Sequence, residues 1–332
     1  MKKLLALLLS LALLLSLSAC GSTSSNDSSN EEPATGHANV YVLSGPTGIG
    51  AVQLWAKSEK GETKNTYTFT CVSANDEIVA AVSGGQADIA AVATNMASAL
   101  YNKTEGKVTV LAVNTTGVLS LLAKNDSVKT IADLKGKTIY APGQGANPEY
   151  ILRYVLKNNG VDPDSDVKIE FVAEGSELVG VWAKDAEVVI LAPQPVATML
   201  KVNNSDAVTL FDMTDEWNKI SKESSLMMGC VIIRNEFLNE HPGVVKQFLS
   251  EYQESIQAAK ADAAATGTLC ETYGIIPKAA IATKAIPDCG LTFVTGQEMK
   301  TGLSGYLKVM FDANPKSIGG KLPADDFYYV EK

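Results

Sequence analysis

The strongest constraint on the fold is an alternation of short apolar strands with helices, which starts twice along the chain. The first block opens with a strand at 39–43, a glycine-rich turn at 44–48 and a helix from residue 49. The second block begins after residue 117 and contains another glycine-rich turn, at 142–146, that leads into a helix at 148–157. Such alternation is typical of parallel sheets covered by helices. We therefore predict an α/β fold in which each block forms a mostly parallel sheet flanked by helices.

The remaining strands are predicted from runs of apolar and β-branched residues. They lie at 66–72, 89–92, 108–113, 119–123, 138–140, 168–172, 188–191, 207–210 and 230–233. The strand at 230–233 is assigned to the second block. From His241 onward the pattern predicts mainly helices, including a long amphipathic helix over 244–264.

The first twenty residues have the pattern of an export signal. Lys2 and Lys3 precede a leucine-rich run that ends at Leu17, and small residues then lead to Cys20. The cysteine resembles the end of a bacterial lipobox, which implies cleavage before Cys20 and lipid on its thiol and new amine. We predict a signal peptide over 1–19 and a flexible, lipidated tether over 20–37. An ordinary signal peptide and an N-terminal membrane anchor are the alternatives.

The charged residues limit the classes of ligand and partner. The formal net charge is −9 and no basic patch is evident, which argues against a nucleic-acid partner. The chain has only two arginines, Arg153 and Arg234. It therefore cannot build a pocket of several arginines around an anion, although an anion could still bind at helix N-termini.

Beyond Cys20 the chain has four cysteines. Cys270 and Cys289 flank a short segment that contains proline, and we predict that they form a disulfide. Cys71 and Cys230 lie in strand-like runs and are interpreted as small buried apolar residues. The cysteine spacings and the two histidines do not suggest a metal site, and no cofactor is expected.

Candidate ligand-binding residues follow from the strand ends, because ligands of open α/β sheets bind where strands lead into helices. The predicted contacts are Gly45, Pro46, Thr47, Asn75, Thr94, Asn95, Thr115, Gln144, Gly145, Ala146 and Gln194. Tight turns and helix caps explain many of these residues equally well. Asn147 in particular is predicted to cap a helix that begins at Pro148, which leaves Gln144 as the better ligand contact.

None of the predicted contacts is charged. Amides, hydroxyls and backbone N–H groups suit an uncharged polar or heteroaromatic ligand. They also permit a single anion held by helix dipoles.

Three segments resemble those of type II periplasmic binding proteins. They are Asp133–Ile139 followed by Gly143, Glu77–Val82 followed by Gly84–Ala90, and Asn235–Leu238 followed by His241 and Pro242. The set is most similar to the nitrate-, sulfonate- and taurine-type group, which also includes thiamine-precursor binders. The resemblance implies two lobes joined by two hinge crossings. Lobe 1 would hold 38–115 and 239–332, and lobe 2 would hold 116–238.

The resemblance also implies a function. The chain would be a monomeric, lipid-anchored receptor on the outer face of the cell membrane, delivering a small ligand to an ABC permease and its ATPase, without enzymatic activity. Nitrate, sulfonates and thiamine precursors are all compatible ligands. The alternatives are an enzyme on the same fold, of the menaquinone- or pyrimidine-pathway type, and a ligand-sensing lipoprotein without a transporter.

Overall fold

The computed structural model describes residues 35–221 and 224–331. The predicted signal peptide and Cys20 lie outside the described residues. Among the helices of the described part, none is long and apolar enough to cross a membrane.

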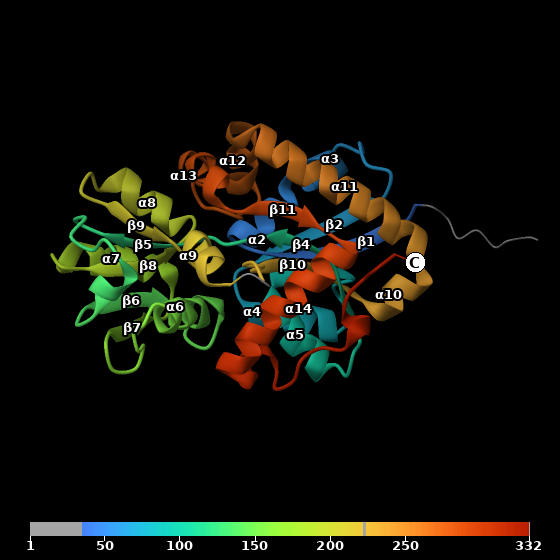
Figure 1. Cartoon of the computed structure of the whole chain (residues 1–332). Coiled ribbons are helices and arrows are strands. Elements are labelled where there is room, and N and C mark those ends of the chain that lie inside the picture. Colours follow the sequence, from blue (N-terminus) through green and yellow to red (C-terminus); the bar gives the residue numbers. More distant parts are fainter. Residues whose placement is uncertain (1–34, 222–223, 332) are drawn as a thin grey trace, which may run out of the picture. The chain divides into compact units, whose positions relative to one another are not determined.

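Two β-sheets organise the described chain (Figure 1). The six-stranded sheet has the order β11-β4-β10-β3-β1-β2 and consists of β1 (His37–Leu43), β2 (Thr66–Val72), β3 (Ile89–Ala93), β4 (Val108–Thr115), β10 (Gly229–Arg234) and β11 (Leu291–Val294). The five-stranded sheet has the order β7-β6-β8-β5-β9 and consists of β5 (Leu119–Ala123), β6 (Thr138–Pro142), β7 (Lys168–Val172), β8 (Val189–Pro193) and β9 (Val208–Asp212).

Helices cover both sheets. Those that accompany the six-stranded sheet are α2 (Pro46–Ile49), α3 (Val52–Glu59), α4 (Asn75–Ser83), α5 (Thr94–Lys103), α10 (Asn235–Glu240), α11 (Pro242–Ala261), α12 (Ala263–Thr272), α13 (Ala279–Ala285) and α14 (Gly296–Ala313), with the 3-10 turns η3 (Ile286–Asp288), η4 (Pro315–Ile318) and η5 (Asp325–Phe327). Those that accompany the five-stranded sheet are α6 (Asn147–Asn158), α7 (Leu178–Lys184), α8 (Val196–Asn203) and α9 (Met213–Ile220), with η1 (Ile131–Leu134) and η2 (Gly175–Glu177).

Strand alternation sends side chains to apolar layers on both faces of the six-stranded sheet. Along β3, Ile89 and Ala91 join the layer that contains α3 and α11, whereas Ala90 and Val92 join the opposite layer, which contains α4, α5 and α14. Figure 1 shows these two groups of helices on opposite sides of the sheet. The two sheets, each flanked by helices, confirm the predicted two-lobed α/β fold.

Both sheets are mixed rather than mostly parallel. β1 pairs in parallel with β2 and β3, but β10 lies between β3 and β4 and runs antiparallel to both. In the other sheet β6 is parallel to β7 and β8, while β5 is antiparallel to β8 and β9. The strands that follow a crossing between the sheets, β5 and β10, reverse direction, and the edge strand β11 is also antiparallel to its neighbour β4.

β10 does not belong to the second block, to which the sequence analysis assigned it. Its residues are paired with β3 and β4 of the six-stranded sheet, for example Cys230 with Val92 and Val113. The strand is apolar on both faces, so its sequence fits the centre of either sheet. The helices α5 and α10 and the edge strand β11 were not predicted, and β1 begins at His37, which was expected in the tether.

The predicted disulfide between Cys270 and Cys289 is absent, because all four cysteines of the described residues are free thiols. Cys270 and Cys289 are both fully buried in the apolar layer beside α11. Burial raises the pKa of Cys270 to about 12 and also raises that of Cys289. The neutral thiol is not the reactive species, so both residues act as small apolar side chains. Cys230 is buried as predicted, and Cys71 is half-buried.

An ion pair fixes β10 to its neighbours at one end of the six-stranded sheet. Arg234 Nη2 lies 2.7 Å from Asp88 Oδ1, and Arg234 Nε donates to the carbonyl of Ala87. The other carboxylate oxygen, Asp88 Oδ2, accepts hydrogen bonds from the backbone and side-chain nitrogens of Asn39. The pair is largely buried and ties β10 to the strands β1 and β3.

We predict that Arg234→Ala lowers the free energy of unfolding by about 3 kcal/mol, because it leaves the buried Asp88 carboxylate without its cation. Urea denaturation of the full chain measures this change. Lys308→Ala is the control, since it removes an exposed ion pair with Asp312 and is expected to cost less than about 0.5 kcal/mol. Equal effects of the two substitutions would contradict the role of the buried pair.

Candidate functional site

The turn between β1 and α2 is anchored by backbone contacts. Gly45 has φ of 90°, in the left-handed region that favours glycine, and its N–H donates to the carbonyl of Ile275 at 2.8 Å. The carbonyl of Thr47 accepts a hydrogen bond from Asn114 Nδ2 at 2.9 Å. The predicted residues Gly45, Pro46 and Thr47 are thus held against the end of β4.

A backbone segment just before β10 brings the starts of two helices together. The N–H of Thr94, at the start of α5, donates to the carbonyl of Met228 at 3.0 Å. Asn147 Nδ2, at the start of α6, donates to the same carbonyl at 3.3 Å. The N–H of Met228 donates to the carbonyl of Thr115 at 3.0 Å. Two helix N-termini, one from each lobe, therefore converge on Met228.

Three of the predicted ligand contacts are buried and already have partners within the protein. Thr94 Oγ1 donates to the carbonyl of Met227 at 2.6 Å, and Asn95 Nδ2 donates to the carbonyl of Ser317 at 3.4 Å. Thr115 Oγ1 donates to Asn114 Oδ1 at 3.1 Å. These contacts position the loops, and a ligand contact by the three side chains stays a prediction.

The predicted contacts of the second lobe differ in accessibility. Gln144 is exposed, whereas Gln194 is only 5% exposed and its Oε1 accepts a hydrogen bond from Thr198 Oγ1 at 2.8 Å. Gly145, with φ of 75°, donates its N–H to Glu149 Oε2 at 2.7 Å, and Ala146 is the residue that caps α6. In the first lobe, Asn75 is the exposed first residue of α4.

A groove of about 1460 Å³ runs along α6 and faces the end of α14. Gln144 and Gly145 line it at one end, together with Glu149, Tyr150 and Asn314. Asn314 Nδ2 donates to the hydroxyl of Tyr150 at 2.9 Å, a hydrogen bond between the two lobes. The structure thus places two of the predicted residues in a cavity at the boundary of the lobes.

The role predicted for Asn147 is wrong. The helix α6 begins at Asn147 rather than at Pro148, and its N-cap residue is Ala146. The side chain of Asn147 is 3% exposed; its Nδ2 reaches Met228, and its Oδ1 is buried without a hydrogen-bond partner. Pro148 correctly indicated that a helix starts nearby, but the sequence did not indicate that the Asn147 side chain bonds to Met228.

The lobes also touch outside the crossings. The ring centroids of Trp217 on α9 and Tyr306 on α14 lie 5.6 Å apart. On α8, Lys201 forms an ion pair with Asp288 of η3, with an N–O distance of 3.7 Å. Apolar burial is continuous from α14 to the five-stranded sheet. The described lobes are therefore in contact at several places around the candidate site.

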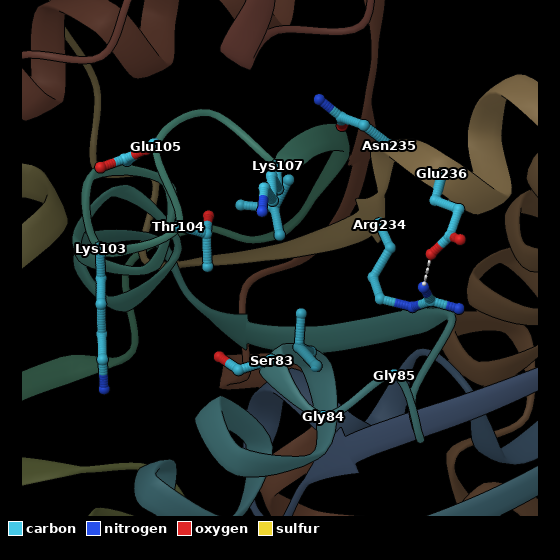
Figure 2. Close-up of a pocket in the computed structure, with 12 residues that line it drawn as sticks. Ser83, Gly84, Gly85, Lys103, Thr104, Glu105, Lys107, Arg234, Asn235 and Glu236 are labelled. Carbon is cyan, nitrogen blue, oxygen red and sulfur yellow. Dashed lines mark hydrogen bonds and ion pairs between the residues drawn. The ribbon is translucent and has the colours of Figure 1, made fainter.

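A second cavity of about 540 Å³ lies at the opposite end of the six-stranded sheet, where β3 and β4 begin (Figure 2). It is lined by Ser83–Gly85, Lys103–Glu105, Lys107 and Arg234–Glu236, among others. Figure 2 shows Arg234 turned toward Glu236, and Arg234 Nη1 lies 2.6 Å from Glu236 Oε2. None of the predicted site residues lines this cavity. In residues 35–221 and 224–331, no group of three or more His, Cys, Asp or Glu side chains could hold a metal ion.

Comparison with known proteins gives a family and a fold. A family model described as NMT1/THI5 like matches residues 72–265, more than half of the chain. Two provisionally named binding proteins, from Brucella abortus and Brucella suis, are 26% identical to this chain over 212 residues. That match covers 61% of this chain and only 58% of the length of each relative.

Solved structures share the fold at low sequence identity. An ABC transporter structure from Parabacteroides distasonis has a TM-score of 0.74 at 22% identity, covering 89% of this chain and 99% of that chain. The periplasmic aliphatic sulphonate binding protein SsuA of Escherichia coli has a TM-score of 0.68 at 12% identity, covering 89% and 94%. The alkanesulfonate-binding protein SsuA of Xanthomonas axonopodis, bound to MOPS, has a TM-score of 0.63 at 14% identity, covering 88% and 96%.

We predict that Thr94→Val lowers the free energy of unfolding by about 1–2 kcal/mol, because the carbonyl of Met227 loses a buried hydrogen bond. Urea denaturation measures the effect. The matched control is Thr209→Val on β9, where the side chain is exposed and a change within about 0.5 kcal/mol is expected. An unchanged stability of Thr94→Val would show that this hydroxyl does not anchor α5.

Proposed function

Because the chain belongs to the NMT1/THI5-like family, we propose that it is an extracytoplasmic solute-binding protein of an ABC importer. The observation that carries the proposal is the convergence of α5 and α6, one from each lobe, on the carbonyl of Met228. Helix N-termini present backbone N–H groups without intrahelical partners, and two of them close together make a polar position between the lobes. A small solute bound there would contact both lobes at once.

The lobe boundaries that we propose differ from the sequence-based ones. Lobe 1 comprises 38–115 and 229–332, because β10 pairs in the six-stranded sheet, and lobe 2 lies between them. The first crossing is tied to both lobes: Thr116 N–H donates to the carbonyl of Gly290, and the carbonyl of Val118 accepts from the N–H of Gln194. The second crossing leads into Met227 and Met228.

The mechanism would be a shift of population toward the closed arrangement when ligand binds. Closure of two domains about short crossings is a common way to enclose a small ligand. The hydrogen bond from Asn314 to Tyr150 and the ion pair of Lys201 with Asp288 join the lobes at two further places. These contacts would favour the closed arrangement without touching the ligand.

The proposal also includes the location and partners of the protein. A lipid on Cys20 would hold it at the outer face of the cell membrane as a monomer beside a permease and its ATPase. No enzymatic activity is proposed. His37 lies at the start of β1 beside Thr66, and His241 ends α10, so neither histidine is near the convergence of α5 and α6.

We predict that at least one small polar solute raises the melting temperature of the full chain, purified in detergent, in a dose-dependent way. Gln144→Ala is expected to weaken this binding about tenfold, equivalent to about 1.4 kcal/mol. The melting temperature without ligand should not change, because the Gln144 side chain is exposed.

The matched control is Gln253→Ala on α11, an exposed glutamine away from the groove, which should bind like the wild type. A panel without any shift would contradict the proposed function. Wild-type affinity in Gln144→Ala would instead reject only the assignment of Gln144.

We predict that Cys20→Ala moves the protein from the membrane fraction to the soluble or secreted fraction and abolishes labelling by a palmitate analogue. The physical reason is that the thiol of Cys20 is the attachment point for the proposed lipid. Cys71→Ala serves as the control and should keep both properties. Continued labelling of Cys20→Ala would refute the anchor.

A further inference from the structure

One hydrogen-bond acceptor in a buried part of the candidate site, Asn147 Oδ1, has no donor. Asn147 is 3% exposed, and its Oδ1 has no hydrogen-bond partner in the protein. The orientation of the amide is fixed, because Nδ2 donates to the carbonyl of Met228, and an oxygen at that position would face another acceptor. Buried polar atoms are normally paired, so Oδ1 marks a place where a donor is missing.

The donors at the start of α5 and in the turn before α6 do not supply the missing hydrogen bond. The N–H and the hydroxyl of Thr94 are directed to the carbonyls of Met227 and Met228. The N–H of Gly145 is directed to Glu149. These donors come from both lobes and are already used, so Asn147 Oδ1 stays without a partner at the boundary between the lobes.

The charges beside α6 limit what that donor can be attached to. Glu149 Oε2 accepts from Gly145 N–H at 2.7 Å, so a carboxylate already occupies the turn before the helix. Arg153 is shared between Glu149 and Asp164, with N–O distances of 2.7 Å to each. One guanidinium therefore faces two carboxylates, and an incoming anion would meet like charge.

Two further cations do not offset this repulsion. Lys157 also lines the groove, but it lies ten residues after Asn147, about 15 Å further along the helix. Arg234, the second arginine of the chain, is paired with Asp88 and Glu236.

We propose that Asn147 Oδ1 accepts a hydrogen bond from an N–H group of the solute, and that the solute carries no negative charge at this end. The inference rests on the proposed function and names its ligand class: uncharged or cationic molecules with an amide or amino donor. Oxyanions such as sulfonates and nitrate are excluded from this position, although solved structures that share the fold include sulfonate-binding proteins.

The test uses the full chain, purified in detergent, with two sets of probes. Nicotinamide, 1-methylcytosine and 9-methyladenine are uncharged and carry N–H donors only on the exocyclic nitrogen, whereas ethanesulfonate, nitrate and sulfate are oxyanions without N–H. Thermal shift identifies binders and isothermal titration gives their affinities. For each binder, the analogue with a dimethylated nitrogen lacks the donor and tests the same hydrogen bond without any substitution in the protein.

Asn147→Ala is compared with Asn102→Ala. Asn102 also has a buried Oδ1 without a partner, but its Nδ2 holds the carbonyls of Ile318 and Lys321 near the end of α5, away from α6. Both substitutions remove an amide that is bonded to backbone carbonyls. A purely structural role would therefore affect the two variants alike, whereas a ligand contact affects Asn147→Ala alone.

We expect a neutral donor to bind the wild type and the oxyanions not to bind. Asn147→Ala should weaken that binding at least tenfold and Asn102→Ala less than twofold. The dimethylated analogue should bind the wild type at least tenfold more weakly, a comparison that stands even if Asn147→Ala fails to fold.

Binding of an oxyanion to the wild type would overturn the inference. So would an undiminished affinity of the wild type for the dimethylated analogue, or of Asn147→Ala for the neutral donor. Each of these results would leave the proposed function intact. If no probe of either set binds the wild type, the proposed function fails and the inference fails with it.

Discussion

The hydrogen bonds of Met228 are the interaction on which the arrangement of the two lobes depends. Its N–H is bonded to the end of β4, and its carbonyl accepts from Thr94 at the start of α5 and from Asn147 at the start of α6. These contacts come immediately before β10, which enters the six-stranded sheet between β3 and β4. The carbonyl of Met228 is therefore hydrogen-bonded to both lobes at the point where the chain returns to the six-stranded sheet.

The direction of β10 follows from that return. A strand that comes back from the other lobe enters the six-stranded sheet from the opposite end, so β10 runs antiparallel to both neighbours. The ion pair of Arg234 with Asp88 then fixes the far end of β10 beside β1 and β3. As a result both ends of the strand are held, one by Met228 and the other by Arg234.

The charges beside α6 are the basis for the class of ligand that we propose. The chain has two arginines, and both are paired with carboxylates: Arg153 with Glu149 and Asp164, and Arg234 with Asp88 and Glu236. The turn before α6 already holds the carboxylate of Glu149. Structures that share the fold at 12–14% identity therefore establish its architecture, while the ligand depends on the residues placed at the helix starts.

The sequence by itself determined the α/β class, nearly all strands and the loops at strand ends, because periodicity records which faces are buried. Tertiary structure decided the rest. A strand that is apolar on both faces does not specify its partners, so β10 was assigned to the wrong lobe. The side chains of Thr94 and Gln194 form hydrogen bonds within the protein. The thiols of Cys270 and Cys289 do not form a disulfide. The role of Asn147 depends on its hydrogen bond to Met228, which is 81 residues away in the chain. Such a contact between lobes cannot be predicted from the local sequence, because it produces no local pattern.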